Sequence, residues 1–294
     1  MTKRQSPHFQ LLKDAWIKRH QKIRKDLWKK HDSSLQWMRD NSQHLLVGSA
    51  TGLLMLAHPA SAATITQNLL PPPTPSEERT VHNKEELIRQ LSALLPESVQ
   101  SLTEDQKKQI GHVLTTFFHM PATTTLEGKQ LNRSYGIIGA EQHLIRYPGD
   151  TMSTHFSDEN EKQFWSSGMA PGRGAWGYFS NSRSDMTRQD VLREKYYIAV
   201  QTFLSPGWNE DPNGLYAFFK YRKMLVVNPE NGKAVVVVIG DAGPSLKTDK
   251  QLGGSPEVMA HLERQDGGAR GPVLYYFIDD PENTIPLGPI SVEK

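Results

Sequence analysis

Apolar residues in the C-terminal half gather in short runs, and one of these runs is the clearest structural signal in the chain. Five consecutive β-branched residues, 235–239, predict a strand buried on both faces. A second apolar run, 224–227, precedes it, and the intervening Asn231-Gly232 pair predicts a hairpin turn. The longer run ends in a glycine-flanked loop that carries Asp241. Because glycines let such a loop approach a ligand closely, this carboxylate is a candidate catalytic group.

Further short apolar runs, separated by turns rich in Gly and Pro, predict more strands between residues 121 and 294. The candidates are 137–140, 142–147, 174–179 and 273–278. Residues 190–203 instead have the pattern of a helix capped by Asp190, in which one residue of 194–197 could face a site while the others pack. The fold class predicted for 121–294 is mainly β or α+β, with a barrel.

Residues 84–120 predict a helical hairpin that packs on this domain. Apolar residues recur at helical spacing in 85–95 and again in 110–118. Thr103 and Gln106 form a capping-box pattern before the second helix.

The N-terminal residues have the pattern of a membrane-targeting segment. Residues 1–44 hold 11 Lys and Arg against four Asp, a net charge of +7, whereas the whole chain carries +2. The uncharged apolar stretch 45–63 contains Ala60-Ser61-Ala62, which fits a signal-peptide cleavage site. We expect either a cleaved signal peptide or a single transmembrane anchor. In both cases residues 1–44 are expected in the cytoplasm and the body of the protein outside it.

Residues 64–83 predict a linker, because the prolines at 71–73 and 75 favour a stiff, extended chain. The basic leader is either a disordered tail or a helix on the inner leaflet of the membrane. No known nucleic-acid-binding motif accompanies its charge, so nucleic acid is not an expected partner.

The composition and the motif search exclude several kinds of chemistry. The chain has no cysteine, which excludes disulfides, thiol nucleophiles and cysteine-based zinc sites. The sequence also contains no P-loop, dinucleotide fingerprint, Gly-x-Ser-x-Gly elbow or His-Glu-x-x-His motif. We therefore predict no cofactor.

Residues 223–244 resemble the core motif of double-psi β-barrel cell-wall proteins of the rare lipoprotein A type, which are lytic transglycosylases. The matching positions are Val226, Asn228, Asn231, Gly232, Lys233, Val235, Val237, Ile239, Asp241, Gly243 and Pro244. Residues 174–178 are similar to another strand of such barrels. The resemblance implies a double-psi-like barrel, a general acid/base role for Asp241, peptidoglycan as partner and a lyase activity.

The sequence departs from this family after the Gly-Pro pair. The family's second acidic motif is replaced by Gly253-Gly254-Ser255-Pro256, although Ser255 can still cap a helix over 257–262. Two hypotheses therefore stand: cleavage of peptidoglycan glycan strands, or an envelope glycan-binding module that has lost the chemistry.

Residues 141–155 hold four titratable side chains, and they generate a second set of candidates. Glu141 or His143 is a candidate catalytic partner for Asp241, and His155 is a candidate substrate contact. The spacing of His143 and Asp150 is similar to that of zinc D-Ala-D-Ala peptidases, a third hypothesis. No later histidine pair completes a metal set, so no metal ligand is predicted. The alternative is a β-hairpin of polar residues around a turn at 148–149.

Four other side chains are candidates for substrate binding. Trp176 and Tyr178 either stack on sugar rings or pack in the core. Asn228 and Ser255, which lie in and just after the matching stretch, are the remaining candidates.

Overall fold

The computed structural model describes residues 75–156, 161–264 and 270–292, with side chains from Asn83 onward. The expected leader and membrane-targeting segment, 1–63, lie outside the described residues. No helix within the described ranges is both long enough and apolar enough to span a membrane.

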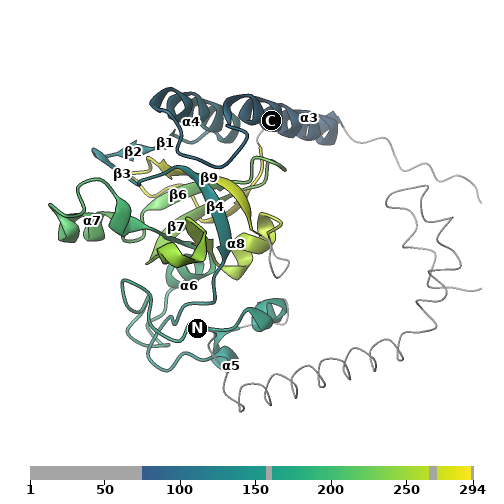
Figure 1. Cartoon of the computed structure of the whole chain (residues 1–294). Helices are drawn as coiled ribbons and strands as arrows, with labels where there is room; N and C mark the ends of the chain where they lie inside the picture. Colours follow the sequence, from purple (N-terminus) through teal and green to yellow (C-terminus); the bar gives the residue numbers. More distant parts are fainter. Residues whose placement is uncertain (1–74, 157–160, 265–269, 293–294) are drawn as a thin grey trace, which may run out of the picture. The chain divides into compact units, whose positions relative to one another are not determined.

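Six strands close into a β-barrel, which is the centre of the fold (Figure 1). Around the barrel the order is β9, β4, β8, β5, β7 and β6, and β6 pairs with β9 to complete the closure. The β4–β8 and β5–β7 pairs are parallel and the other four are antiparallel. The mixed α+β class and the closed barrel are confirmed, and the barrel is compatible with a double-psi arrangement. The six strands are β4 (Tyr135–Ala140), β5 (Tyr197–Val200), β6 (Lys223–Val227), β7 (Ala234–Ala242), β8 (Leu252–Gly254) and β9 (Gly271–Ile278).

Strand β7 is buried on both faces, as its run of β-branched residues predicts. Val235, Val237 and Ile239 point into the barrel core, whereas Val236 and Val238 pack on its outside. The hairpin between β6 and β7 is also confirmed, with Gly232 at a φ of 68°. A two-sided apolar strand needs cover on its outer face, and the helices and loops around the barrel supply it.

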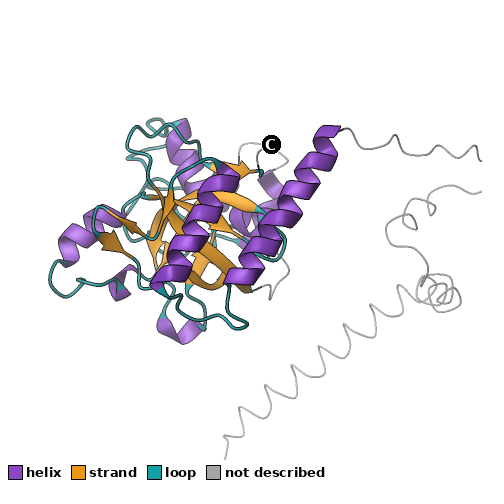
Figure 2. Cartoon of the chain, turned by 90° about the horizontal axis from the view of Figure 1, so that it is seen from above, coloured by secondary structure: helices purple, strands orange, loops and turns teal. Residues whose placement is uncertain are grey.

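Helices α3 (Pro75–Leu94) and α4 (Glu104–Phe118) lie side by side over one side of the barrel (Figure 2). Leu87, Leu91 and Leu114 belong to a buried cluster that also contains Val236 and Tyr276 of the barrel wall. The capping box at Thr103 is confirmed. Helix α3 begins at Pro75, so the segment expected to be a linker, 64–83, is helical from residue 75 onward. Proline is compatible with this start because it is well tolerated in the first turn of a helix.

Residues 190–203 are not one helix, and this is the largest correction to the sequence-based expectation. Helix α6 (Arg188–Lys195) ends at Lys195. The chain then continues directly into β5, which lies between β7 and β8. Tyr197, Ile198 and Val200 are aromatic or β-branched, and all are buried. Pairing on both edges of β5 therefore outweighs the helical pattern of its neighbours.

Two other expected strands are absent from the described residues. Residues 142–147 and 174–179 form loops with isolated bridges, His143 to Met169 and Gly174 to Gly177. The expected turn at 148–149 exists, with Gly149 at a φ of 88°, but it leads into the short helix α5 (Met152–His155) rather than a second strand. These loops cover the side of the barrel where Leu144, Tyr197 and Val238 pack together.

The remaining elements extend the barrel or connect its strands. They are β1 (Ala122–Thr123) on β9, β10 (Gly288–Ile290) on β7, the hairpin of β2 (Thr125–Leu126) and β3 (Lys129–Gln130), α5 (Met152–His155), α7 (Pro212–Phe219), α8 (Pro256–His261), and the 3₁₀ helices η1 (Glu161–Ser167), η2 (Thr202–Leu204) and η3 (Leu246–Thr248). Ser255 caps α8, as expected, by accepting a hydrogen bond from the amide of Val258.

Strand β5 can be tested through Ile198, which is fully buried in the barrel core. We expect Ile198→Ala to lower the free energy of unfolding by about 2–5 kcal/mol, because it leaves a cavity, and Ile198→Val by only about 0.5–1.5 kcal/mol. Urea denaturation of both variants measures the difference. An Ala variant as stable as the parent chain would contradict a buried strand at this position.

Candidate functional site

Asp241 lies at the end of β7 with a half-buried side chain. Its Oδ1 accepts hydrogen bonds from the amides of Ala175, at 2.6 Å, and Ala242, at 2.8 Å. Within the described part of the chain, no hydrogen bond reaches its Oδ2. Burial raises the pKa of this carboxyl group even though the two amides oppose the shift. Asp241 is therefore fixed in orientation through Oδ1, and its open oxygen, Oδ2, makes no hydrogen bond within the described residues.

Glu141 lies on the same outer face of the barrel as Asp241. Asp241 pairs with Ala199 of β5, and Ala199 pairs with Gly253 of β8. The Glu141 carboxylate lies directly over Gly253, where a Cβ atom would come within 2.1 Å of its Oε1. Neighbouring strands are about 4.8 Å apart, so the positions of Asp241 and Gly253 are about 10 Å apart across the small side chain of Ala199.

Glu141 is held by an ion pair and lines a cavity. Its Oε1 is 2.6 Å from Nζ of Lys250, which also donates a hydrogen bond to the carbonyl of Ala140. The cavity beside Glu141 has a volume of about 510 Å³. Its other polar lining residues are Gln142, Gln163, Ser166 and Ser167. Such a lining can hydrogen-bond a ligand that carries hydroxyl groups.

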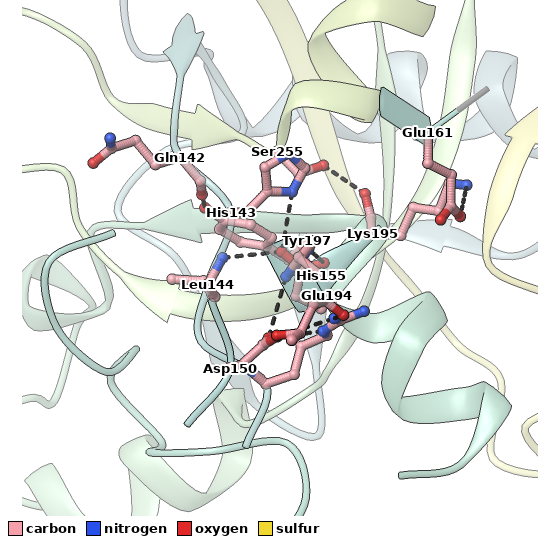
Figure 3. A network of polar contacts seen from close by, with 12 residues as sticks. Gln142, His143, Leu144, Asp150, His155, Glu161, Glu194, Lys195, Tyr197 and Ser255 are labelled. Atoms are coloured by element: carbon pink, nitrogen blue, oxygen red, sulfur yellow. Dashed lines mark hydrogen bonds and ion pairs between the residues drawn. The ribbon is translucent and has the colours of Figure 1, made fainter. Parts of the chain in front are cut away.

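His143 does not lie with Glu141 and Asp241 but in a separate buried cluster with His155 and Glu194 (Figure 3). The side chains of these three residues are at most 4% exposed. Nε2 of His155 is 3.1 Å from Oε2 of Glu194, and Nδ1 of His143 is 3.5 Å from Oε1. Neither ring nitrogen of His143 has a hydrogen-bond partner among the described residues. Apart from this longer contact between Nδ1 and Glu194, the His143 ring is a buried polar group without a hydrogen bond to the described residues.

A second layer of polar groups orients this cluster. Oδ2 of Asp150 is 3.1 Å from Nδ1 of His155 and also accepts a hydrogen bond from Nε of Arg146, at 2.9 Å. The amide of Leu144 donates to Oε1 of Glu194, at 2.9 Å. The side chains of His155 and Glu194 are thus fixed from both sides.

The charges in the cluster shift one another's pKa. Burial alone would lower the pKa of His155, but its contacts with Asp150 and Glu194 raise it to about 9. Burial alone would raise the pKa of Glu194, but its contacts with the two histidines lower it to about 2. The nearby Glu257 is buried, and its pKa is raised to about 7 by burial and by the charge of Glu194. His155 is thus a cation between two carboxylates.

The candidate substrate-binding residues divide into structural and exposed groups. Asn228 and Ser255 are buried and bonded to the backbone, Asn228 to Leu262 and Ser255 to Lys195. Trp176 packs against the barrel core and donates to the carbonyl of Tyr216. Tyr178 is 36% exposed, so its ring can still reach a ligand.

Sequence reasoning missed two features of these sites. Lys250, the partner of Glu141, was not singled out because it lies 109 positions away along the chain. Glu194 was one of a group of helix residues with no assigned partner, and 39 positions separate it from His155. No local pattern signals either contact, since the barrel pairing creates both.

No protein-family model matches the chain, and no curated protein is found to resemble it.

The charged state of His155 predicts a decline in stability at high pH. A histidine in the unfolded chain has a pKa near 6.5, whereas that of His155 is raised to about 9. The contribution of charged His155 to the free energy of unfolding is therefore fully present below about pH 6.5 and is lost as the pH rises to about 9. We expect the chain, treated with chelator to remove any bound metal, to lose on the order of 3 kcal/mol of unfolding free energy over that range. Urea denaturation at several pH values in chelator measures the loss, and His155→Gln should remove most of it. A variant with the same pH slope as the parent chain would contradict this assignment.

Proposed function

We propose that this protein cleaves the glycan strands of peptidoglycan on the outer face of its barrel, with Asp241 as the acid and Glu141 as its partner. The observation that carries the proposal is the placement of these two carboxyl groups on one face of three adjacent strands. Their environments differ, since burial raises the pKa of Asp241 whereas Lys250 forms an ion pair with Glu141. Such a pair can divide the roles of acid and base.

The chemistry assigns one proton transfer to each group. Asp241, protonated at its open oxygen, gives its proton to the glycosidic oxygen as the bond to the anomeric carbon breaks. Glu141 takes the proton from the attacking hydroxyl group. If that group is the 6-hydroxyl of the same sugar, the product is a 1,6-anhydro sugar; if it is water, the product is a reducing sugar. The two products distinguish a lyase from a hydrolase.

The cavity beside Glu141 supports a sugar-containing substrate. Its polar lining offers amide and hydroxyl groups to sugar hydroxyls, and Phe164 of η1 adds an apolar surface. Carbohydrate sites combine such hydrogen-bonding groups with apolar ring contacts. In this proposal the protein reaches its substrate outside the cytoplasm through its N-terminal segment.

A second candidate is a glycan-binding module without catalysis. One observation that favours it is that glycines occupy positions 253 and 254, where the family that this chain resembles carries its second acidic motif. Another is that Glu141 already forms an ion pair with Lys250. Such a module would sediment with peptidoglycan without releasing products.

Replacing Asp241 tests the catalytic proposal. We expect Asp241→Asn to lower the rate of product release by about 10²–10⁴-fold, because the acid is lost. The measurement is mass spectrometry of purified peptidoglycan incubated with the whole chain. Asp249→Asn is the matched control, because it makes the same change at an exposed position nearby. Absence of products from the unmodified chain, with binding intact, would favour the binding module.

Gly253 tests the role of Glu141 without altering either carboxyl group. A methyl group at 253 would overlap the end of the Glu141 side chain and displace it. We expect Gly253→Ala to slow cleavage by about 10–100-fold while the chain stays folded, since small misplacements of catalytic groups are costly. Gly172→Ala is the control, because a Cβ at 172 meets no atom within 4 Å. Unchanged cleavage by Gly253→Ala would exclude Glu141 from the mechanism.

A further inference from the structure

We propose that His143, His155 and Glu194 bind one divalent transition-metal ion of the zinc type. The inference is independent of glycan cleavage, because it concerns a buried cluster that the proposed reaction does not use. It starts from His143, which is fully buried and whose ring nitrogens make no hydrogen bond to the described residues, Nδ1 lying 3.5 Å from Oε1 of Glu194. Buried polar groups are almost always hydrogen-bonded, and neutral imidazole is a common metal ligand. A buried imidazole without a hydrogen bond is therefore suited to binding a metal ion.

The geometry of the cluster fits a metal ion. One potential ligand atom from each of the three side chains lies within 4.8 Å of the other two. Two contacts are shorter, 3.5 Å from His143 to Glu194 and 3.1 Å from His155 to Glu194. Ligands about 2.0–2.2 Å from a tetrahedral zinc ion are about 3.3–3.6 Å apart. Small side-chain rotations therefore suffice to place an ion between them.

The surrounding groups have the arrangement that supports metal-binding histidines. A histidine ligand usually offers one ring nitrogen to the metal and donates from the other to a carboxylate. His155 has this arrangement, since its Nδ1 faces Asp150 and its Nε2 faces Glu194 (Figure 3). Arg146 in turn holds Asp150 through Nε and a second guanidinium nitrogen. Asp150 is thus a positioning residue rather than a ligand.

The charges around the cluster are compatible with a divalent ion. Glu194 is one of the three ligands, and Asp150 lies behind His155 and forms an ion pair with Arg146. A divalent ion held by the two imidazoles would therefore meet the carboxylate of Glu194 directly, while Arg146 offsets the charge of Asp150.

The ligand set defines the class of ion and its role. Two imidazoles and a carboxylate suit zinc and neighbouring transition metals, whereas calcium and magnesium prefer oxygen ligands alone. His143 lies in the loop after β4, His155 at the end of α5, and Glu194 in the last turn of α6. The ion would tie these three segments together outside the barrel. With three protein ligands, a water molecule would complete the tetrahedral coordination of the ion.

The test uses the whole chain without a histidine tag, stripped of metal with chelator. We expect calorimetric titration with Zn²⁺ to show a tight site, and Co²⁺ to give the visible absorption of a tetrahedral site. Zn²⁺ should also raise the melting temperature. His143→Ala should weaken binding by at least 100-fold, and Asp150→Asn by about 10–100-fold.

Two further variants keep the result interpretable. His112→Ala, at an exposed histidine on α4, is the matched control and should bind as the parent chain does. His143→Phe keeps a ring packed against His155 and Phe156 but removes the ligand, so it separates loss of binding from loss of folding. Absence of a tight site in the parent chain would overturn the proposal. So would binding that survives in both folded His143 variants, because the ion would then lie elsewhere.

Discussion

The pairing of β7 with β5 on one edge and β6 on the other is the constraint on which the rest of the structure depends. It closes the barrel around a strand whose apolar side chains are buried on both faces. The parallel pairing of β7 with β5 then positions the residues of both candidate sites. It places Asp241 beside Ala199, and it brings the end of α6, with Glu194, against the loop that carries His143. Both candidate sites therefore depend on one register.

The two sites use buried charge in different ways. At Asp241, partial burial opposes ionisation and two backbone amides limit the effect, which is suited to a group that must give up a proton. In the histidine cluster, opposite charges meet in a region closed to water, and each stabilises the charged form of the other. Removing one member of such a cluster leaves its partner uncompensated, so the cluster should be sensitive to substitution.

Small residues decide where functional groups can lie on the barrel surface. Ala199 and Gly253 leave room between β7 and β8 for the Glu141 carboxylate, which a side chain at 253 would displace. The same glycines mark the departure from the family that the β6–β7 stretch resembles. The carboxylate that lies over Gly253 belongs to Glu141, which follows the end of β4 and is held by Lys250.

The sequence by itself determined the elements whose signals are local. The β-branched run of β7, the Asn-Gly turn, the capping box at Thr103 and the cap at Ser255 are all read from neighbouring residues, because their hydrogen bonds join positions close along the chain. Only the tertiary structure decided that residues 197–200 form a strand rather than the end of a helix, since that depends on partners in β7 and β8. It also decided that His143 meets Glu194 and that Glu141 meets Lys250. Contacts between residues so far apart along the chain leave no periodic trace, because barrel closure rather than local geometry creates them.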